Sequence, residues 1–94
     1  MIQSTSQEAY DLIVDKLGDR QMQVFHALRR IEPACNKAIA AELELPINEV
    51  TPRINELRYK GVVEQAFKAE YDGRTVIFWQ IKHPEINWIQ KELI

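Results

Sequence analysis

The segment 47–61, INEVTPRINELRYKG, places several hydrogen-bonding side chains at helical spacing. Val50, Ile54 and Leu57 fall at i, i+4 and i+7, so a helix here turns them toward a core and leaves the opposite face polar. That face carries Asn48, Thr51, Pro52, Asn55, Glu56 and Tyr59, with Arg53 and Arg58 at its edges. Asparagine can bind adenine, and arginine can bind guanine, through paired hydrogen bonds, so this face is suited to base edges.

Pro52 is the unusual residue of this segment, because a proline inside a helix lacks a backbone donor and costs about 3 kcal/mol. Two starts of the helix remain open. If Asn48 is the N-cap, Pro52 falls about one turn into the helix. If Thr51 is the N-cap, Pro52 is the first helical residue, which is its preferred place. In both cases Pro52 lies near the front of the helix, on the exposed face.

Apolar spacing predicts three helices before this one. The first ends at Gly18, where left-handed backbone is accessible, and the second begins with Asp19 as its N-cap and runs to about 31. A short third helix is capped by Cys35 or Asn36 and closes before Pro46, with Ile47 in the following turn plugging the gap between helices. The expected buried stripes of the second and third helices are Val24, Phe25, Leu28 and Ile31, then Ile39, Ala40 and Leu43.

The pattern changes after Gly61. The stretch VVEQAFKAEYDGRTVIFWQI is rich in β-branched and aromatic residues and is interrupted by Asp72-Gly73. An Asp-Gly pair between two such runs predicts a hairpin, since both turn residues need positive φ. A last helix is expected to begin at Pro84.

The resulting order is helix, helix, short helix, tight turn, helix, hairpin, helix. It resembles a winged helix-turn-helix domain of the broad MarR-like type, and small regulators common in phages and prophages, over residues 20–82. The stretches that carry the resemblance are NKAIAAELELPINEVTPRINELRYKGVV and YDGRTVIFWQI. The resemblance implies a mostly α, α+β fold with a recognition helix at about 48–60 and a wing at 62–81. The chain would then be one domain: an N-terminal helix at 1–18, a winged-helix core at 19–82 and a C-terminal helix at 83–94.

The resemblance also implies sequence-specific binding of double-stranded DNA by a transcriptional regulator. The recognition helix would enter the major groove, while Lys37 and the amides of the short helix would contact phosphates. Arg74 at the wing tip is suited to the minor groove or a phosphate. The expected DNA-binding residues are Asn36, Lys37, Asn48, Thr51, Arg53, Asn55, Arg58, Tyr59, Lys68, Arg74 and Thr75.

Several of these residues also have plain structural explanations. Asn36 and Asn48 are equally suited to capping helices, and Arg58 suits the dipole at a helix C-terminus. Tyr59 would then pack under the wing. Trp79, at an alternating strand position, is expected in the core rather than stacked on a base.

Charge weighs against DNA binding. The formal net charge is −2 and the pI about 5.7, whereas strong nucleic-acid binders are usually basic. Residues 46–82 contain six basic and five acidic side chains, which gives +1, so non-specific affinity should be weak. Because Glu49 and Glu56 lie on the recognition helix itself, the alternative is a protein-interaction module that kept the scaffold and lost DNA binding.

The two outer helices offer a further choice. They would pair in a homodimer, or they would cap the core of their own chain. The residues concerned are Ile13, Val14 and Leu17 with Trp88, Ile89 and Leu93. A dimer would present two recognition helices to half-sites about one helical turn apart.

Enzyme chemistry has little support in the sequence. His26, His83 and a single Cys35 match no zinc spacing, and there is no glycine-rich phosphate loop or nucleophile elbow. We therefore expect neither catalysis nor a cofactor. No apolar run is long enough for a bilayer and the N-terminus is polar, so no membrane partner is expected, and the lone cysteine fits the cytoplasm.

Overall fold

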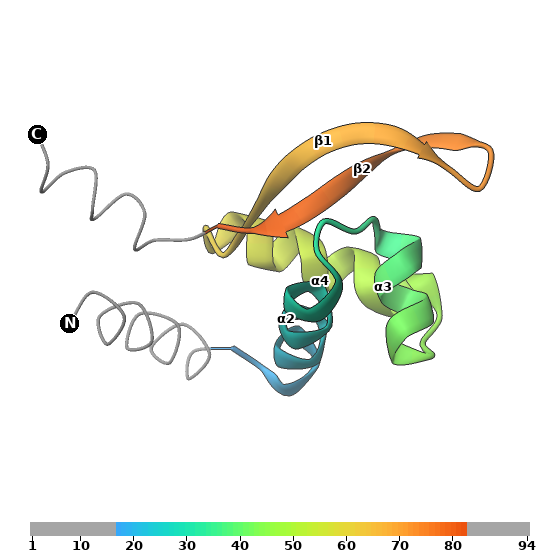
Figure 1. Cartoon of the computed structure of the whole chain (residues 1–94). Helices are drawn as coiled ribbons and strands as arrows, with labels where there is room; N and C mark the ends of the chain where they lie inside the picture. Colours follow the sequence, from blue (N-terminus) through green and yellow to red (C-terminus); the bar gives the residue numbers. More distant parts are fainter. Residues whose placement is uncertain (1–16, 83–94) are drawn as a thin grey trace, which may run out of the picture.

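The computed structural model describes residues 17–82 (Figure 1). In this range the elements are α2 (Asp19–Ile31), α3 (Asn36–Leu43), α4 (Ile47–Tyr59), β1 (Val63–Tyr71) and β2 (Arg74–Ile81). The predicted order of helix, short helix, helix and hairpin is therefore confirmed. The predicted outer helices lie outside the described residues, except for Leu17 and Gly18.

The core forms where the three helices meet the base of the hairpin. The predicted stripes are confirmed: their central residues are at most 5% exposed, and Ile31 and Leu43 pack partly buried at the margin. Trp79 and Ile81 of β2 complete the core, so the expectation of a buried Trp79 also holds. None of the helices in 17–82 is long and apolar enough to cross a membrane.

The hairpin is a two-stranded antiparallel sheet that extends past the helices on the side of α3 (Figure 1). Asp72 and Gly73 both have positive φ, 53° and 81°, as the Asp-Gly signal predicts. A bulge lies between Gln65 and Phe67, which the sequence analysis does not predict. Ala34, before α3, pairs with Trp79 through two backbone hydrogen bonds of 3.0 and 2.8 Å, which anchors the base of the wing to the helices.

The starts of two helices differ from the expectation. Gly18 has φ −70°, so it is not left-handed; it is the N-cap of α2, and Asp19 is the first helical residue. The Gly18 amide donates to Oε1 of Gln21 at 3.2 Å, so the Gln21 side chain satisfies the backbone donor of the N-cap residue. For α3, Cys35 is the N-cap, one of the two predicted residues.

The start of α4 also corrects the prediction. Pro46 is the N-cap, so neither Asn48 nor Thr51 takes that position. The chain leaves α3 through Glu44, in left-handed backbone with φ 54°, and Pro46 is extended, so helix can resume at once. Ile47 then begins α4 with 49% of its surface exposed and does not plug the helix junction. Pro52 becomes the sixth residue of a continuous helix, beyond the first turn.

Candidate nucleic-acid interface

One face of α4 points away from the rest of the fold. Asn48, Pro52, Asn55 and Tyr59, at i, i+4, i+7 and i+11, are all exposed, and we call them the outer stripe. Tyr59 is 91% exposed, which contradicts the explanation that it packs under the wing. Within 17–82 the side chains of the outer stripe make no hydrogen bond or ion pair, so they are available to a ligand. All four are uncharged.

The acidic side chains of α4 lie on the flank next to α2. Glu49 forms an ion pair with Arg20, with 3.7 Å between Nε and Oε2. Glu56 accepts a hydrogen bond of 2.7 Å from Nε2 of Gln21. Arg53 donates from Nη2 to Oε2 of Glu56 at 3.0 Å, so this predicted base-reading arginine sits on the α2 flank, partly buried. The carboxylates that weighed against DNA binding are therefore turned aside and partnered.

The opposite flank of α4 faces the wing. The guanidinium of Arg58 lies 5.8 Å from the centre of the Trp79 ring, which holds a cation between α4 and β2. Thr51 Oγ1 accepts a hydrogen bond of 3.2 Å from Nδ2 of Asn36, which ties the start of α3 to α4. Asn36 therefore does not cap a helix, and its side chain links α3 to α4 by a hydrogen bond. Asn48 does not cap a helix either.

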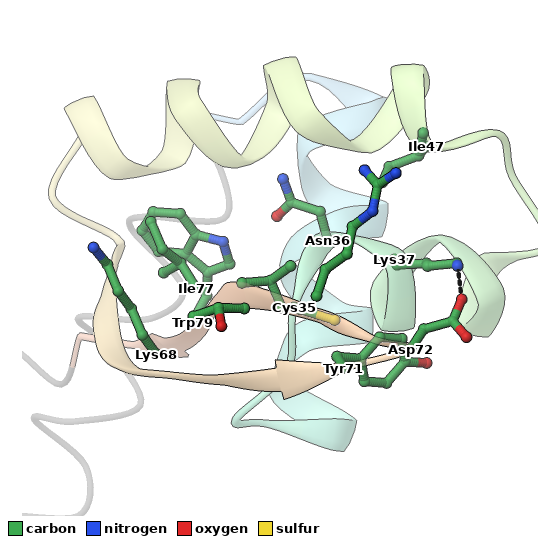
Figure 2. A pocket seen from close by; sticks show the side chains of 12 residues that line it. Cys35, Asn36, Lys37, Ile47, Lys68, Tyr71, Asp72, Ile77 and Trp79 are labelled. Carbon is green, nitrogen blue, oxygen red and sulfur yellow. Dashed lines mark hydrogen bonds and ion pairs between the residues drawn. The ribbon is translucent and has the colours of Figure 1, made fainter.

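A groove of about 970 Å³ separates the wing from the starts of α3 and α4 (Figure 2). Five of the predicted DNA-binding residues line it: Asn36, Lys37, Lys68, Arg74 and Thr75. Other residues that line the groove, among them Tyr71 and Asp72, were not predicted from the sequence. Their types gave no signal, because Asp72 reads as a turn residue and Tyr71 as an ordinary strand residue.

Across the mouth of this groove, Lys37 pairs with Asp72 (Figure 2). The hydrogen bond and the charge of Lys37 lower the pKa of the Asp72 carboxyl, and the same two effects of Asp72 raise the pKa of Lys37. Lys68 and Arg74 are exposed along the same groove. The groove therefore holds three cations and one carboxylate, a set that favours an anionic ligand.

The structure sorts the predicted site residues into connected groups. Asn48, Asn55 and Tyr59 belong to the outer stripe, and Thr51 and Arg58 to its wing-side flank. The other predicted residues line the groove, except for Arg53, which lies on the α2 flank. Among residues 17–82, no group of three or more His, Cys, Asp or Glu is placed to hold a metal ion.

Two helices joined by a tight turn, a third helix behind them and a hairpin at their side define a winged helix-turn-helix fold. Neither a protein-family model nor a curated protein matches the sequence. Solved structures do match. Streptococcus pneumoniae FabT in complex with DNA has a TM-score of 0.60 and 16% identity, over 98% of this chain and 73% of that one.

A second match is Lactococcus lactis ZitR, described as a zinc-responsive MarR family member, with a TM-score of 0.58 and 22% identity. It covers 83% of this chain and 52% of that one, so our chain spans about half the length of ZitR. A Listeria innocua protein of unknown function has a TM-score of 0.57 and 14% identity, over 98% of this chain and 65% of that one. The predicted winged helix-turn-helix fold is confirmed, and the solved structures that share it include a MarR family member.

Proposed function

We propose that this protein binds double-stranded DNA sequence-specifically as a transcriptional regulator. In the proposed complex α4 enters the major groove, and the wing lies on the adjacent backbone or minor groove. The observation that carries the proposal is the outer stripe: Asn48 and Asn55 are exposed without partners, while Glu49 and Glu56 are turned toward α2. The presence of DNA in the FabT structure, on a similar fold, supports the same conclusion.

The groove residues supply the contacts that hold DNA without reading it. Lys37, Lys68 and Arg74 line one groove between the wing and the starts of α3 and α4, and in the proposed complex they contact the DNA backbone. A helix in the major groove contacts base edges mainly through its N-terminal part, which here includes Asn48. Because these cations are few, we expect low non-specific affinity and a shallow dependence of that affinity on salt concentration.

We also propose that the protein acts as a homodimer. Residues 46–82 of each copy carry a net charge of +1. A second copy would add positive charge and recover the affinity that one weakly charged face lacks. Leu17 is buried in the core of its own chain, as the alternative to pairing predicts, and the other residues predicted to pair lie outside the described residues. The selection experiment below tests the dimer directly, because two copies would read inverted halves about one helical turn apart.

A second candidate function is binding to a protein partner. It is favoured by the exposed Ile47 and Tyr59, at the two ends of α4, which are 49% and 91% exposed. Fold does not decide between the two functions, because function depends on the site and not on the scaffold. The two exposed side chains are separated by the length of α4, whereas a protein-docking patch is normally contiguous.

The deciding experiment is selection of binding sites from a random duplex pool at roughly 50 mM salt, where weak electrostatic binding is retained. We expect an enriched motif with the full chain and its loss with the double variant Asn48→Ala/Asn55→Ala. Gln65→Ala removes an exposed amide from the wing and serves as the matched control, which should keep the motif. If the full chain enriches no motif, the DNA proposal fails and the protein partner becomes the working function.

A further inference from the structure

We propose that the outer stripe reads A·T base pairs through the major groove. This specificity rests on the proposed function, and it concerns which pairs are read. The first observation is chemical: the stripe contains two carboxamides, one proline and one tyrosine, and no cation or carboxylate. A carboxamide donates and accepts hydrogen bonds at once, which matches N6 and N7 on the major-groove edge of adenine.

The second observation is the position of the cations. Guanine is read mainly by arginine or lysine, and α4 with its C-cap contains Arg53, Arg58 and Lys60. Each is engaged away from the stripe. Arg53 pairs with Glu56, Arg58 lies over Trp79, and Lys60 donates to Oε1 of Gln21 at 2.9 Å. The face that enters the groove is therefore left without the usual guanine-reading groups.

The two asparagines of the stripe are spaced to contact base pairs about three steps apart. Asn48 and Asn55 are seven residues apart, about 10.5 Å along the helix axis. At 3.4 Å per base pair this is about three base pairs. Pro52 lies between them on the same face, and its apolar ring is suited to the thymine 5-methyl group, the one apolar feature of the major-groove edge. Amides at both ends and an apolar surface between them complement two A·T pairs about three steps apart with a thymine between them.

An A·T preference could also come from Arg74 in a narrow minor groove, so the test must separate the two grooves. Inosine paired with cytosine does this. Inosine lacks the guanine 2-amino group, so an I·C pair presents the minor groove of A·T and the major groove of G·C. Deoxyuridine in place of thymidine removes only the methyl group in the major groove.

The experiment measures the Kd of the full chain, by fluorescence anisotropy, for four duplexes of about 20 base pairs, two helical turns. The duplexes are alternating A·T, A·U, I·C and G·C. We expect A·T to bind most tightly, A·U less tightly, and I·C as weakly as G·C. One bidentate asparagine–adenine contact corresponds to about 5-fold to about 150-fold in affinity.

Each other result overturns the inference in a recognisable way. Equal binding of A·T and I·C, both tighter than G·C, assigns the preference to the minor groove and leaves DNA binding intact. Equal binding of all four duplexes leaves only backbone contacts, and tighter binding of G·C and I·C means that guanine is read. Failure to bind any duplex removes the proposed function itself.

Variants assign the effect to the stripe. Asn55→Ala should reduce the ratio of the A·T affinity to the I·C affinity by about fivefold or more, while the affinity for G·C stays the same. Gln65→Ala, which removes an exposed amide outside the stripe, should keep the full preference. An unchanged preference in Asn55→Ala and in Asn48→Ala would show that these amides do not read the bases.

Discussion

Lys37 on the first turn of α3 and Asp72 at the turn of the wing form an ion pair across the mouth of the groove. The two side chains are 59% and 63% exposed, so water surrounds the pair and another anion can approach Lys37. In the proposed complex that anion is a DNA phosphate. Lys37 would then exchange one negative partner for another, and Asp72 would be left beside the backbone. The pair therefore sets a limit on affinity that a substitution can remove.

The first prediction is that Asp72→Asn tightens DNA binding. Loss of the carboxylate frees Lys37 and removes a charge that repels phosphate, so affinity should rise for all DNA sequences. The slope of log affinity against log salt concentration should become steeper by about 1, because one more phosphate is neutralised. Asparagine tolerates the positive φ of this turn, so the hairpin is retained. Kd measured over a salt series checks the prediction.

Glu70→Gln is the matched control, since it removes an equal charge from an exposed residue of the same wing. It should have the smaller effect, because Asp72 pairs with Lys37 and Glu70 does not. If the two variants tighten binding equally, general repulsion explains the result and the ion pair has no part in it.

The second prediction concerns pH. The pKa of Asp72 in the folded protein lies below its usual 3.8. The contribution of Asp72 to folding stability is therefore present above pH 3.8 and is lost as the pH falls through the folded-state pKa. The pKa of Lys37 in the folded protein lies above its usual 10.5. The contribution of Lys37 to folding stability is therefore present below pH 10.5 and is lost as the pH rises through the folded-state pKa. The pair should therefore be intact across the whole range between them.

The measurement is an NMR titration of the Asp72 carboxyl in the parent chain and in Lys37→Gln. We expect the Asp72 pKa to move up toward 3.8 when the ammonium is removed. Identical titration curves in both proteins would mean that the two groups do not interact in solution.

Most of the fold is predictable because its signals are local. The stripe of Val50, Ile54 and Leu57 places α4 and gives its buried face, and Asp72-Gly73 places the turn of the wing. These features depend on residues within one or two turns of each other. The outer stripe follows from the same spacing, since it lies opposite the buried one.

What the sequence does not predict are pairings between distant residues. Asp72 meets Lys37 across 35 positions, and Glu56 meets Gln21 across the same separation. Both carboxylates count as negative charges in the sequence, and only the fold shows that each has a partner. The bridge of Ala34 to Trp79 is missed for the same reason, because a single residue pair leaves no periodic pattern.

The third prediction separates backbone contacts from base contacts. Arg74→Ala should weaken binding to all duplexes and reduce the salt slope by about 1, because one phosphate or minor-groove cation is lost. Asn55→Ala should leave the salt slope the same and relax the preference at one base pair. Selection from a random pool combined with a salt series checks both, and identical losses on every sequence would contradict the separate roles.

The last prediction concerns Pro52, which lies sixth in α4 and has no amide to donate to the carbonyl of Asn48. Pro52→Ala restores that donor and relieves the contact of the ring with the preceding turn. The free energy of unfolding, measured in urea, should rise by about 1–3 kcal/mol. Asn55→Ala, on the same exposed face, is the control for helix propensity and should gain only about 0.5 kcal/mol. In Pro52→Ala the preference for A·T over A·U should also fall, because most of the apolar surface that meets the thymine methyl is removed. A proline that costs stability and supplies a contact predicts both changes together.

A gain in stability with the methyl preference intact would place the thymine contact on another residue. No gain in stability would mean that α4 accommodates the proline ring without cost.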